Sequence, residues 1–419
     1  MTTPDEVLAG SEDFRIVFDR AGRGPAGHPT RPDIELLSPG FYANFDELTW
    51  WMRDNAPMYW DDATGIWGAA AHADVSRMSR DWRTFCSGKG SRPESSVPSM
   101  INFDAPEHTR RRRLVSAGFT RRRVEDHEAY IRAKVTQLID AVIERGECDV
   151  VADLATPLPM YMIGHLMGLP EADHHQLLHW SDLFATGGNE IREQVEQAVG
   201  EYAAYILGKV AERRGQGGED LVSLVVNADD EDGPLSDIDL VFETMLVLVG
   251  GDETTRHVIS GGLAEVLRRP GLFEQLQADR SLLPGAIEEM LRWTTPVRNM
   301  NRTATCDVEV HGQQVREGDR ILLLYPSANR DASVFDDPYV FDITRSPNDH
   351  MAFGGYGRHV CLGAPLARLE LRVLFEEMLD RFHGLHLAPH ALLLQRRGNF
   401  VLGLNQVDVR FRPGARVGG

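Results

Sequence analysis

Apolar side chains recur at three- and four-residue spacing over most of the chain between residues 120 and 295. This spacing puts them on one face of an α-helix, so it predicts amphipathic helices. A further long helix is expected in "CLGAPLARLELRVLFEEML", which begins at Cys361. The other strong helical segments are residues 122–144, 173–185, 193–213, 237–268 and 284–293.

Alternation typical of β-strands is confined to short pieces, "CDVEVHGQQV" and "RILLLY" after Thr303 and "FVLGL" near the end. We therefore expect a mainly α fold with a smaller β part. Residues 1–40 should be irregular, because "AGRGPAGHPTRPD" is too rich in glycine and proline for a regular element. Neither a linker-like composition nor an internal repeat divides residues 41–419, which we expect to form a single domain.

The charge balance of the chain bears on its possible binding partners. The chain carries 44 Lys and Arg against 63 Asp and Glu, a formal net charge of -19, which opposes nonspecific binding to nucleic acid. Within this acidic chain, "RRRRLVSAGFTRRR" places seven arginines between Arg110 and Arg123. Two interpretations stay open for this run, a solvated helix face and a docking site for an anionic partner.

Four cysteines occur, Cys86, Cys148, Cys306 and Cys361, far apart and without a CxxC pair. Together with the lack of a secretory pattern in "MTTPDEVLAGSEDF", this predicts a reduced, cytoplasmic setting. The apolar stretch around residues 245–249 is much shorter than the ~20 residues that cross a bilayer. We therefore expect no membrane anchor.

Cys361 lies between a glycine-rich loop and the expected long helix. Gly355, Gly357 and Gly363 allow a close approach to a flat ligand, and the positive end of the helix would favour a thiolate. Zinc and iron–sulfur sites need several ligands at short spacing, whereas a haem iron needs one. The alternative is an ordinary buried cysteine.

The longest helical pattern contains "MLVLVGGDETTRHVISGG". Gly250 and Gly251 each cost a helix interior about 1 kcal/mol relative to alanine, and space for a ligand, water or dioxygen would compensate. Glu253 and Thr254 follow, an acid and an alcohol able to relay a proton into that space. Tight helix packing beside a solvated acid is the alternative.

A third motif is "EEMLRW", in which Glu289 and Arg292 share a helix face. Such a pair occurs by chance in a chain of this size. Arg345, in the downstream "FDDPYVFDITR", could close a buried Glu–Arg–Arg set, which makes the pair a candidate structural lock.

These motifs, in this order and with the PxxF segment at Pro338, resemble the cytochrome P-450 superfamily of haem-thiolate monooxygenases over nearly the whole chain. The resemblance implies a helical prism around a buried haem b, with Cys361 as the axial iron ligand and Glu253 and Thr254 as the proton-delivery pair. It makes Glu289, Arg292 and Arg345 a fold-stabilising triad. It also implies four contacts to the haem propionates, from His108, Arg112, Arg302 and His359.

The loop departs from the family at one position. An aromatic residue usually stands seven residues before the cysteine, but here that residue is Gly354 and Phe353 stands eight before. The loop therefore carries one extra residue, which could alter the surroundings of the sulfur.

The resemblance also implies partners. Since the chain shows no flavin or nicotinamide domain, electrons should come from a ferredoxin and its NAD(P)H-dependent reductase. Among bacterial branches, the sequence looks most like actinobacterial hydroxylases of cholesterol or cholestenone side chains, which implies a hydrophobic substrate. Its alternatives are a tailoring oxygenase for a polyketide or peptide, and a non-catalytic haem-binding or haem-free protein. Candidate substrate contacts, apolar or nearly so, are Met245, Val249, Thr295, Val297, Met300, Phe400, Val401 and the segment around Phe184.

Overall fold

The computed structural model describes residues 24–25, 27–92, 97–186, 192–228, 230–391, 393–396 and 398–418. Most of the segment predicted to be irregular, residues 1–23 and 26, lies outside this part. Residues 27–38 form turns without a helix or strand, and the first described helix, α2, begins at Pro39.

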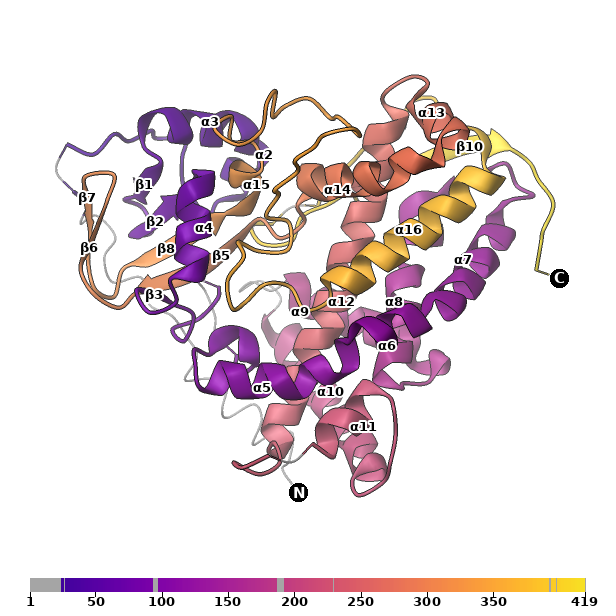
Figure 1. Cartoon of the computed structure of the whole chain (residues 1–419), viewed down its shortest axis with the longest axis horizontal. Helices are drawn as coiled ribbons and strands as arrows, with labels where there is room; N and C mark the ends of the chain where they lie inside the picture. The colour runs from indigo at the N-terminus through magenta and orange to yellow at the C-terminus, as the bar shows by residue number, and fades with distance from the viewer. Residues whose placement is uncertain are drawn as a thin grey trace.

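Helices make up most of the described chain (Figure 1). They are α2 (Pro39–Ala43), α3 (Phe45–Asn55), α4 (His72–Arg80), α5 (Glu107–Ser116), α6 (Arg121–Asp126), α7 (Glu128–Val142), α8 (Pro157–Met167), α9 (His174–Thr186), α10 (Arg192–Arg213), α11 (Leu221–Val226), α12 (Asp237–Leu267), α13 (Leu272–Ala278), α14 (Leu283–Thr294), α15 (Tyr325–Ala328) and α16 (Ala364–Arg381).

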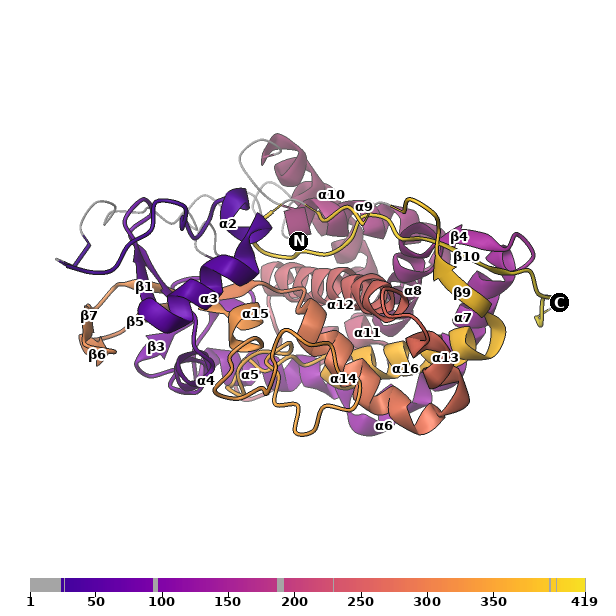
Figure 2. The same cartoon turned by 90° about the horizontal axis from the view of Figure 1, so that it is seen from above.

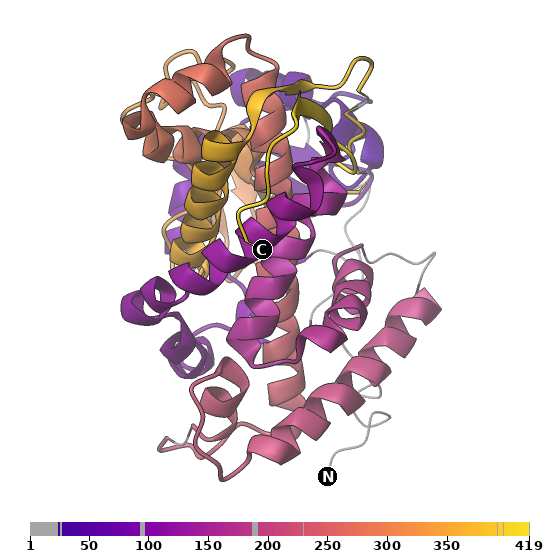
Figure 3. The same ribbon diagram turned by 90° about the vertical axis from the view of Figure 1, so that its right-hand side faces the viewer.

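Helix α12 runs through the middle of the helical part, as Figures 1 and 3 show. It packs against α8, α9, α10, α14 and α16. Ser236 and Asp239 form a capping box at its first turn, which satisfies backbone N–H groups there. Buried residues occur all around the helix, as expected of a helix enclosed by others. The central position brings the Gly250–Gly251 pair into the interior.

The helix predictions agree with the structure except at one place. The segment 122–144 was expected to be one helix, but it divides into α6 and α7 at His127. The other predicted helices correspond to α9, α10, α12, α14 and α16, with ends that differ by three residues at most. Periodicity does not show the division, because apolar positions continue across His127.

The strands form a smaller part at two ends of the molecule (Figure 1). A five-stranded sheet has the order β1-β2-β8-β5-β3, with β2 and β8 parallel and the other pairs antiparallel. A three-stranded sheet has the order β4-β10-β9, and β6 pairs with β7. The strands are β1 (Met58–Asp61), β2 (Ile66–Ala69), β3 (Phe85–Cys86), β4 (Glu147–Asp149), β5 (Asn299–Ala304), β6 (Val308–Val310), β7 (Gln313–Val315), β8 (Arg320–Leu324), β9 (His383–Leu387) and β10 (Asp408–Arg412).

Strand β8 shows why the five-stranded sheet is stable. Its side chains alternate between two hydrophobic clusters, with Ile321 and Leu323 in one and Leu322 and Leu324 in the other. Both faces of the sheet are therefore covered. The predicted strand "FVLGL" is not a strand in the structure. Its residues make only isolated bridges, between Val401 and Val297 and between Leu404 and Gln395.

Within the described residues, none of the helices combines the length and the apolar character needed to cross a lipid bilayer.

Candidate active site

Cys361 lies just before α16, whose first residue is Ala364. The side chain has exposed surface, yet burial is the largest influence on the thiol and raises its pKa. The backbone N–H groups of Gly363 and Ala364 and the charge of Arg112 oppose the effect of burial on the pKa. The amides at the helix start thus point to the sulfur as predicted, but burial outweighs them.

The loop before Cys361 accommodates its extra residue without losing its anchors. The Cys361 N–H donates to the Phe353 carbonyl at 2.8 Å, and the Phe353 ring packs under the Arg368 guanidinium. Between them, Gly354 and Tyr356 adopt positive φ angles of 90° and 60°. The extra residue is thus absorbed where the backbone takes left-handed conformations.

Gly357 shows how closely this loop approaches α4. A Cβ atom at Gly357 would lie 1.8 Å from the carbonyl oxygen of Ser79. A side chain there would therefore push the loop away from α4.

The four predicted propionate contacts come together near Cys361. The rings of His108 and His359 lie 4.1 Å apart, and the Arg112 guanidinium donates to the Val360 carbonyl at 2.7 Å. Burial first, and then the charges of Arg302 and His108, lower the pKa of His359 to about 2. Burial and the charge of Arg112 lower the pKa of His108 to about 4. These groups disfavour positive charge on one another.

This cationic group fits a ligand that carries carboxylates. Within the described part of the chain, neither Arg112 nor Arg302 forms an ion pair, although Arg302 is buried. The Nδ1 atom of the buried His108 has no hydrogen-bond partner there either. Arg112 and Arg302 donate to the backbone carbonyls of Val360 and Asn301, respectively. Neither guanidinium has an anionic partner among the described residues, however, and a buried cation such as Arg302 is unfavourable without one. The residues present therefore fit the propionates of a haem.

The glycine pair of α12 has two different roles. A Cβ atom at Gly250 would meet no atom within 4 Å, and this residue is exposed although it lies in the middle of the central helix. A Cβ at Gly251 would instead lie 2.6 Å from Ile163 of α8. Gly250 thus borders an open space, whereas Gly251 allows tight packing. The helix has no break here, and the Thr254 hydroxyl donates to the Gly250 carbonyl at 2.9 Å.

Glu253 is completely buried and fully paired. Arg256 donates to one carboxylate oxygen, and Arg396 donates to the other at 2.8 Å. The His257 ring lies 3.5 Å from the carboxylate. Burial would raise the pKa of Glu253, but His257 and the two arginines outweigh burial and hold it below its ordinary value. To carry a proton toward Thr254, Glu253 has to exchange some of these partners.

Asp252 is a candidate that the sequence analysis did not single out. Its side chain is fully buried, and no hydrogen bond of ordinary geometry reaches either carboxyl oxygen from the described residues. Burial raises its pKa to about 7, against the charge of Arg256, and Ser181 of α9 is close enough to affect it. The available signal was an acid inside an otherwise apolar helix pattern.

We expect the Asp252→Asn variant to gain stability over the wild type as pH rises. An acid with a raised pKa binds its proton more tightly in the folded than in the unfolded chain, so the wild type loses stability between about pH 4 and pH 8. Asparagine does not titrate. At about 1.4 kcal/mol per pKa unit, the difference in unfolding free energy between the variant and the wild type should grow by roughly 4 kcal/mol over this pH range. Urea unfolding at both pH values, with the exposed Glu274→Gln variant as control, measures it. A difference in unfolding free energy that does not change with pH would contradict the prediction.

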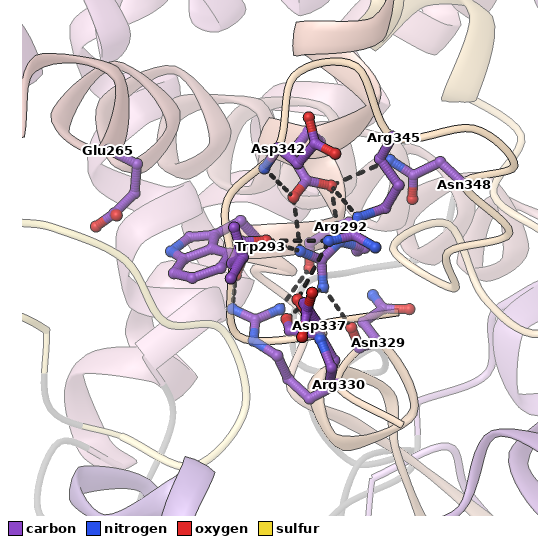
Figure 4. A network of polar contacts seen from close by, with 12 residues as sticks. Glu265, Arg292, Trp293, Asn329, Arg330, Asp337, Asp342, Arg345 and Asn348 are labelled. Carbon is purple, nitrogen blue, oxygen red and sulfur yellow. Dashed lines mark hydrogen bonds and ion pairs between the residues drawn. The ribbon is translucent and has the colours of Figure 1, made fainter. Parts of the chain in front are cut away.

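The structure brings Glu289, Arg292 and Arg345 together, and Figure 4 shows the two arginines in this polar network. Glu289 and Arg292 are completely buried and joined by two hydrogen bonds of 2.6 and 2.7 Å. Arg345 lies 3.3 Å from the same carboxylate. Arg292 also donates to the carbonyls of Asn329 and Pro338, which fixes the irregular segment before the cysteine loop. The set therefore ties α14 to that segment.

A family model for cytochrome P450 matches residues 146–390, more than half of the chain. The chain belongs to the cytochrome P450 family. The predicted fold class and the predicted monooxygenase activity are thereby confirmed, and with them a haem-thiolate cofactor.

Relatives and solved structures agree with this assignment. The P450 is 46% identical to the Steroid C26-monooxygenase of Mycolicibacterium smegmatis, over 93% of this chain and 98% of that protein. It is 45% identical to the Steroid C26-monooxygenase of Mycobacterium tuberculosis, over 92% and 99%. Among solved structures, CYP109E1 from Bacillus megaterium in complex with corticosterone has a TM-score of 0.81 and 32% identity, covering 88% of this chain and 98% of that one.

The candidate substrate contacts of this P450 come from four parts of the chain. Met245 and Val249 lie on α12 before Gly250, and Val249 is half-buried. Val297 forms a bridge with Val401, which joins the start of β5 to the late segment that carries Phe400. Met300 lies in β5, and Phe184 lies in α9 against the core.

Thr295 differs from these residues. Its side chain has no exposed surface, and its hydroxyl donates to the Arg292 carbonyl at 2.7 Å and accepts from Asn329 at 2.8 Å. Thr295 therefore contributes hydrogen bonds at the end of α14 and does not border an open space in this structure.

The arginine run divides into a part that pairs with acids elsewhere in the chain and a part whose ion pairs lie within its own helix. Arg110 and Arg113 both contact Asp230, and the buried Arg111 contacts Asp239. Arg121 and Arg122 are about nine-tenths exposed, and their acid neighbours are on their own helix. The first half of the run thus serves the fold, and the second half keeps its charge at the surface.

Proposed function

We propose that this P450 hydroxylates the side chain of a steroid, using haem b and electrons from a separate ferredoxin and its NAD(P)H-dependent reductase in the cytoplasm. The observation that carries the proposal is the 46% identity, over nearly the full length of both chains, to a protein named Steroid C26-monooxygenase. The apolar character of Val249, Val297 and Phe400 supports it, because a steroid side chain offers few polar groups.

When bound, the haem activates dioxygen for insertion into a C–H bond, and the protein supplies orientation and protons. Cys361 would hold the iron, and His108, Arg112, Arg302 and His359 would hold the propionates. Thr254 donates to the Gly250 carbonyl beside the open space and would pass a proton there. Glu253 would supply that proton after exchanging a partner.

The exposed cations on α6 support the proposed electron donor. Arg121 and Arg122 stay at the surface, and a small acidic ferredoxin would complement their charge. Raising the ionic strength should then slow electron transfer more than substrate binding.

A spin-state titration tests the substrate proposal. Cholestenone should shift the absorption spectrum of the haem-loaded protein, whereas a fatty acid and a macrolide should not. The product should carry one added oxygen at the end of the steroid side chain. A Val249→Trp variant should weaken the shift, and the exposed Val340→Trp variant should leave it unchanged.

The tailoring-oxygenase alternative has its own outcome in the same experiment. A shift with the macrolide and none with steroids would replace the proposal by a tailoring oxygenase. One structural neighbour supports that alternative. It is the cytochrome P450 PksS of the Bacillus subtilis bacillaene polyketide synthase, which has a TM-score of 0.83 and 31% identity over 91% of this chain and 100% of that one.

A further inference from the structure

Glu253 receives its charged partners from three elements that meet around α12. Arg256 and His257 lie on α12 itself, one turn from Glu253. Asp182 lies on α9, accepts from Arg256 at 3.0 Å and affects the pKa of Glu253. Arg396 comes from the late hairpin, which we define as residues 393–396 and 398–404. Two of the three elements are therefore far from α12 in sequence.

The same two elements carry candidate substrate contacts. Phe184 follows Asp182 on α9 by two residues. Phe400 and Val401 belong to the late hairpin, as does Arg396, and Figure 2 shows this yellow segment next to α12. A ligand that presses on α9 or on the late hairpin thus presses on an element that holds Glu253.

Backbone pairing holds the late hairpin together, so a displacement caused by a bound ligand would be transmitted along it. The Arg396 N–H donates to the Gly403 carbonyl at 2.8 Å, and Gln395 bridges Leu404. A Cβ atom at Gly403 would lie 2.0 Å from the His257 ring, so the hairpin backbone lies directly against the partner of Glu253. A shift of its tip therefore reaches both Arg396 and His257.

The tip of the late hairpin is also hydrogen-bonded to β5 and to the residue just before β5. Arg298 N–H donates to the Phe400 carbonyl at 2.8 Å, and the Asn299 side chain donates to the Asn399 carbonyl at 2.6 Å. The late hairpin thus connects the edge of the candidate substrate space with Glu253, and Arg396 is its charged end.

We propose that Arg396 is a positioning residue for proton delivery: through it, a substrate seated against Phe400 and Val401 determines whether Glu253 can turn toward Thr254. Without substrate, Arg396 holds the carboxylate in its buried site. With substrate, the late hairpin moves, one charge-assisted hydrogen bond is released, and Glu253 carries a proton from its polar surroundings to the Thr254 hydroxyl. The inference rests on the proposed oxygenation by this site.

The Arg396→Gln variant tests the inference in the haem-loaded enzyme with the ferredoxin system and cholestenone. Consumption of NAD(P)H without substrate should rise about tenfold, the change expected for losing one charge-assisted hydrogen bond. Arg396→Lys, which keeps the charge, should restore most of the wild-type behaviour. Arg268→Gln removes an exposed arginine of α12 that pairs with Glu265, and it should behave as the wild type.

A second readout does not depend on turnover. Infrared difference spectra between substrate-bound and substrate-free protein should show a carboxyl band in the wild type that Glu253→Gln abolishes. In Arg396→Gln this band should no longer respond to substrate. If Arg396→Gln folds poorly, Phe400→Ala should abolish the substrate dependence of the band while leaving Arg396 in place.

Retention of the substrate-dependent band in Arg396→Gln and Phe400→Ala, with NAD(P)H consumption equal to that of Arg268→Gln, would overturn the inference. Failure of the substrate proposal is distinguishable. In that case steroids would leave the haem spectrum of every variant unchanged, and NAD(P)H consumption without substrate would still test Arg396.

Discussion

The Cys361→Ser variant is expected to lose monooxygenase turnover by at least about a thousandfold, or about 4 kcal/mol of barrier. A serine oxygen does not replace the soft thiolate that donates electron density to haem iron and favours cleavage of the O–O bond. The loop itself should persist, because its anchors are the Phe353 carbonyl and the glycine contacts with α4, which do not involve the sulfur. Turnover with cholestenone, normalised to bound haem, measures the effect.

Cys306→Ser is the matched control, since Cys306 is exposed and lies in the turn before β6. It should keep wild-type turnover and haem content. Full turnover by Cys361→Ser with a normal absorption spectrum would refute the assignment of the axial ligand.

Breaking the buried Glu–Arg–Arg set should have the largest effect on stability. Arg292→Met leaves the Glu289 carboxylate buried with Arg345 as its remaining cation, and it frees the carbonyls of Asn329 and Pro338. Removing one partner of a buried pair costs about 3–5 kcal/mol, so the variant should unfold at much lower urea concentration or fail to accumulate. Equilibrium unfolding and haem retention measure this.

The double variant Glu289→Gln with Arg292→Met is the informative comparison. It removes the uncompensated charge and should recover part of the lost stability, because the coupling belongs to the pair. Arg268→Met, at an exposed ion pair, should cost less than about 1 kcal/mol. Equal stabilities for Arg292→Met and Arg268→Met would show that the buried set is not a structural lock.

Features encoded within a few residues could be predicted from the sequence. Helix α12 was expected at residues 237–268 and is found at Asp237–Leu267, since its apolar spacing and cap are local. The pairing of Glu289 with Arg292 follows from i,i+3 geometry on α14. The thiol before α16 was likewise visible in the glycine spacing of its loop.

Contacts between residues that are far apart in the sequence could not be predicted in this way. Arg396 binds Glu253 across 143 positions, and no local pattern connects them. Arg110 and Arg113 pair with Asp230, which lies in a different part of the chain. The sequence therefore did not show that these two arginines differ from the others of the run in their ion pairs. The segment at Phe400 alternates like a strand, but within the described residues its backbone pairs only through isolated bridges and does not form a ladder.

The pKa of Cys361 is a third feature that the sequence did not predict. The glycines and the helix start correctly predicted amide groups near the sulfur, but local sequence does not show how much protein surrounds it. The loop around it is packed against α4 and α5, which come from elsewhere in the chain. For this reason the sign of the shift required the structure.

The absorption spectrum of the reduced, CO-bound wild-type protein tests the central claim most directly, since it reports the atom opposite CO on the iron. Ligation by the Cys361 thiolate predicts a Soret band shifted to the red of the position seen with a neutral nitrogen ligand. A band at that unshifted position, in freshly reduced protein with full haem content, would contradict the account.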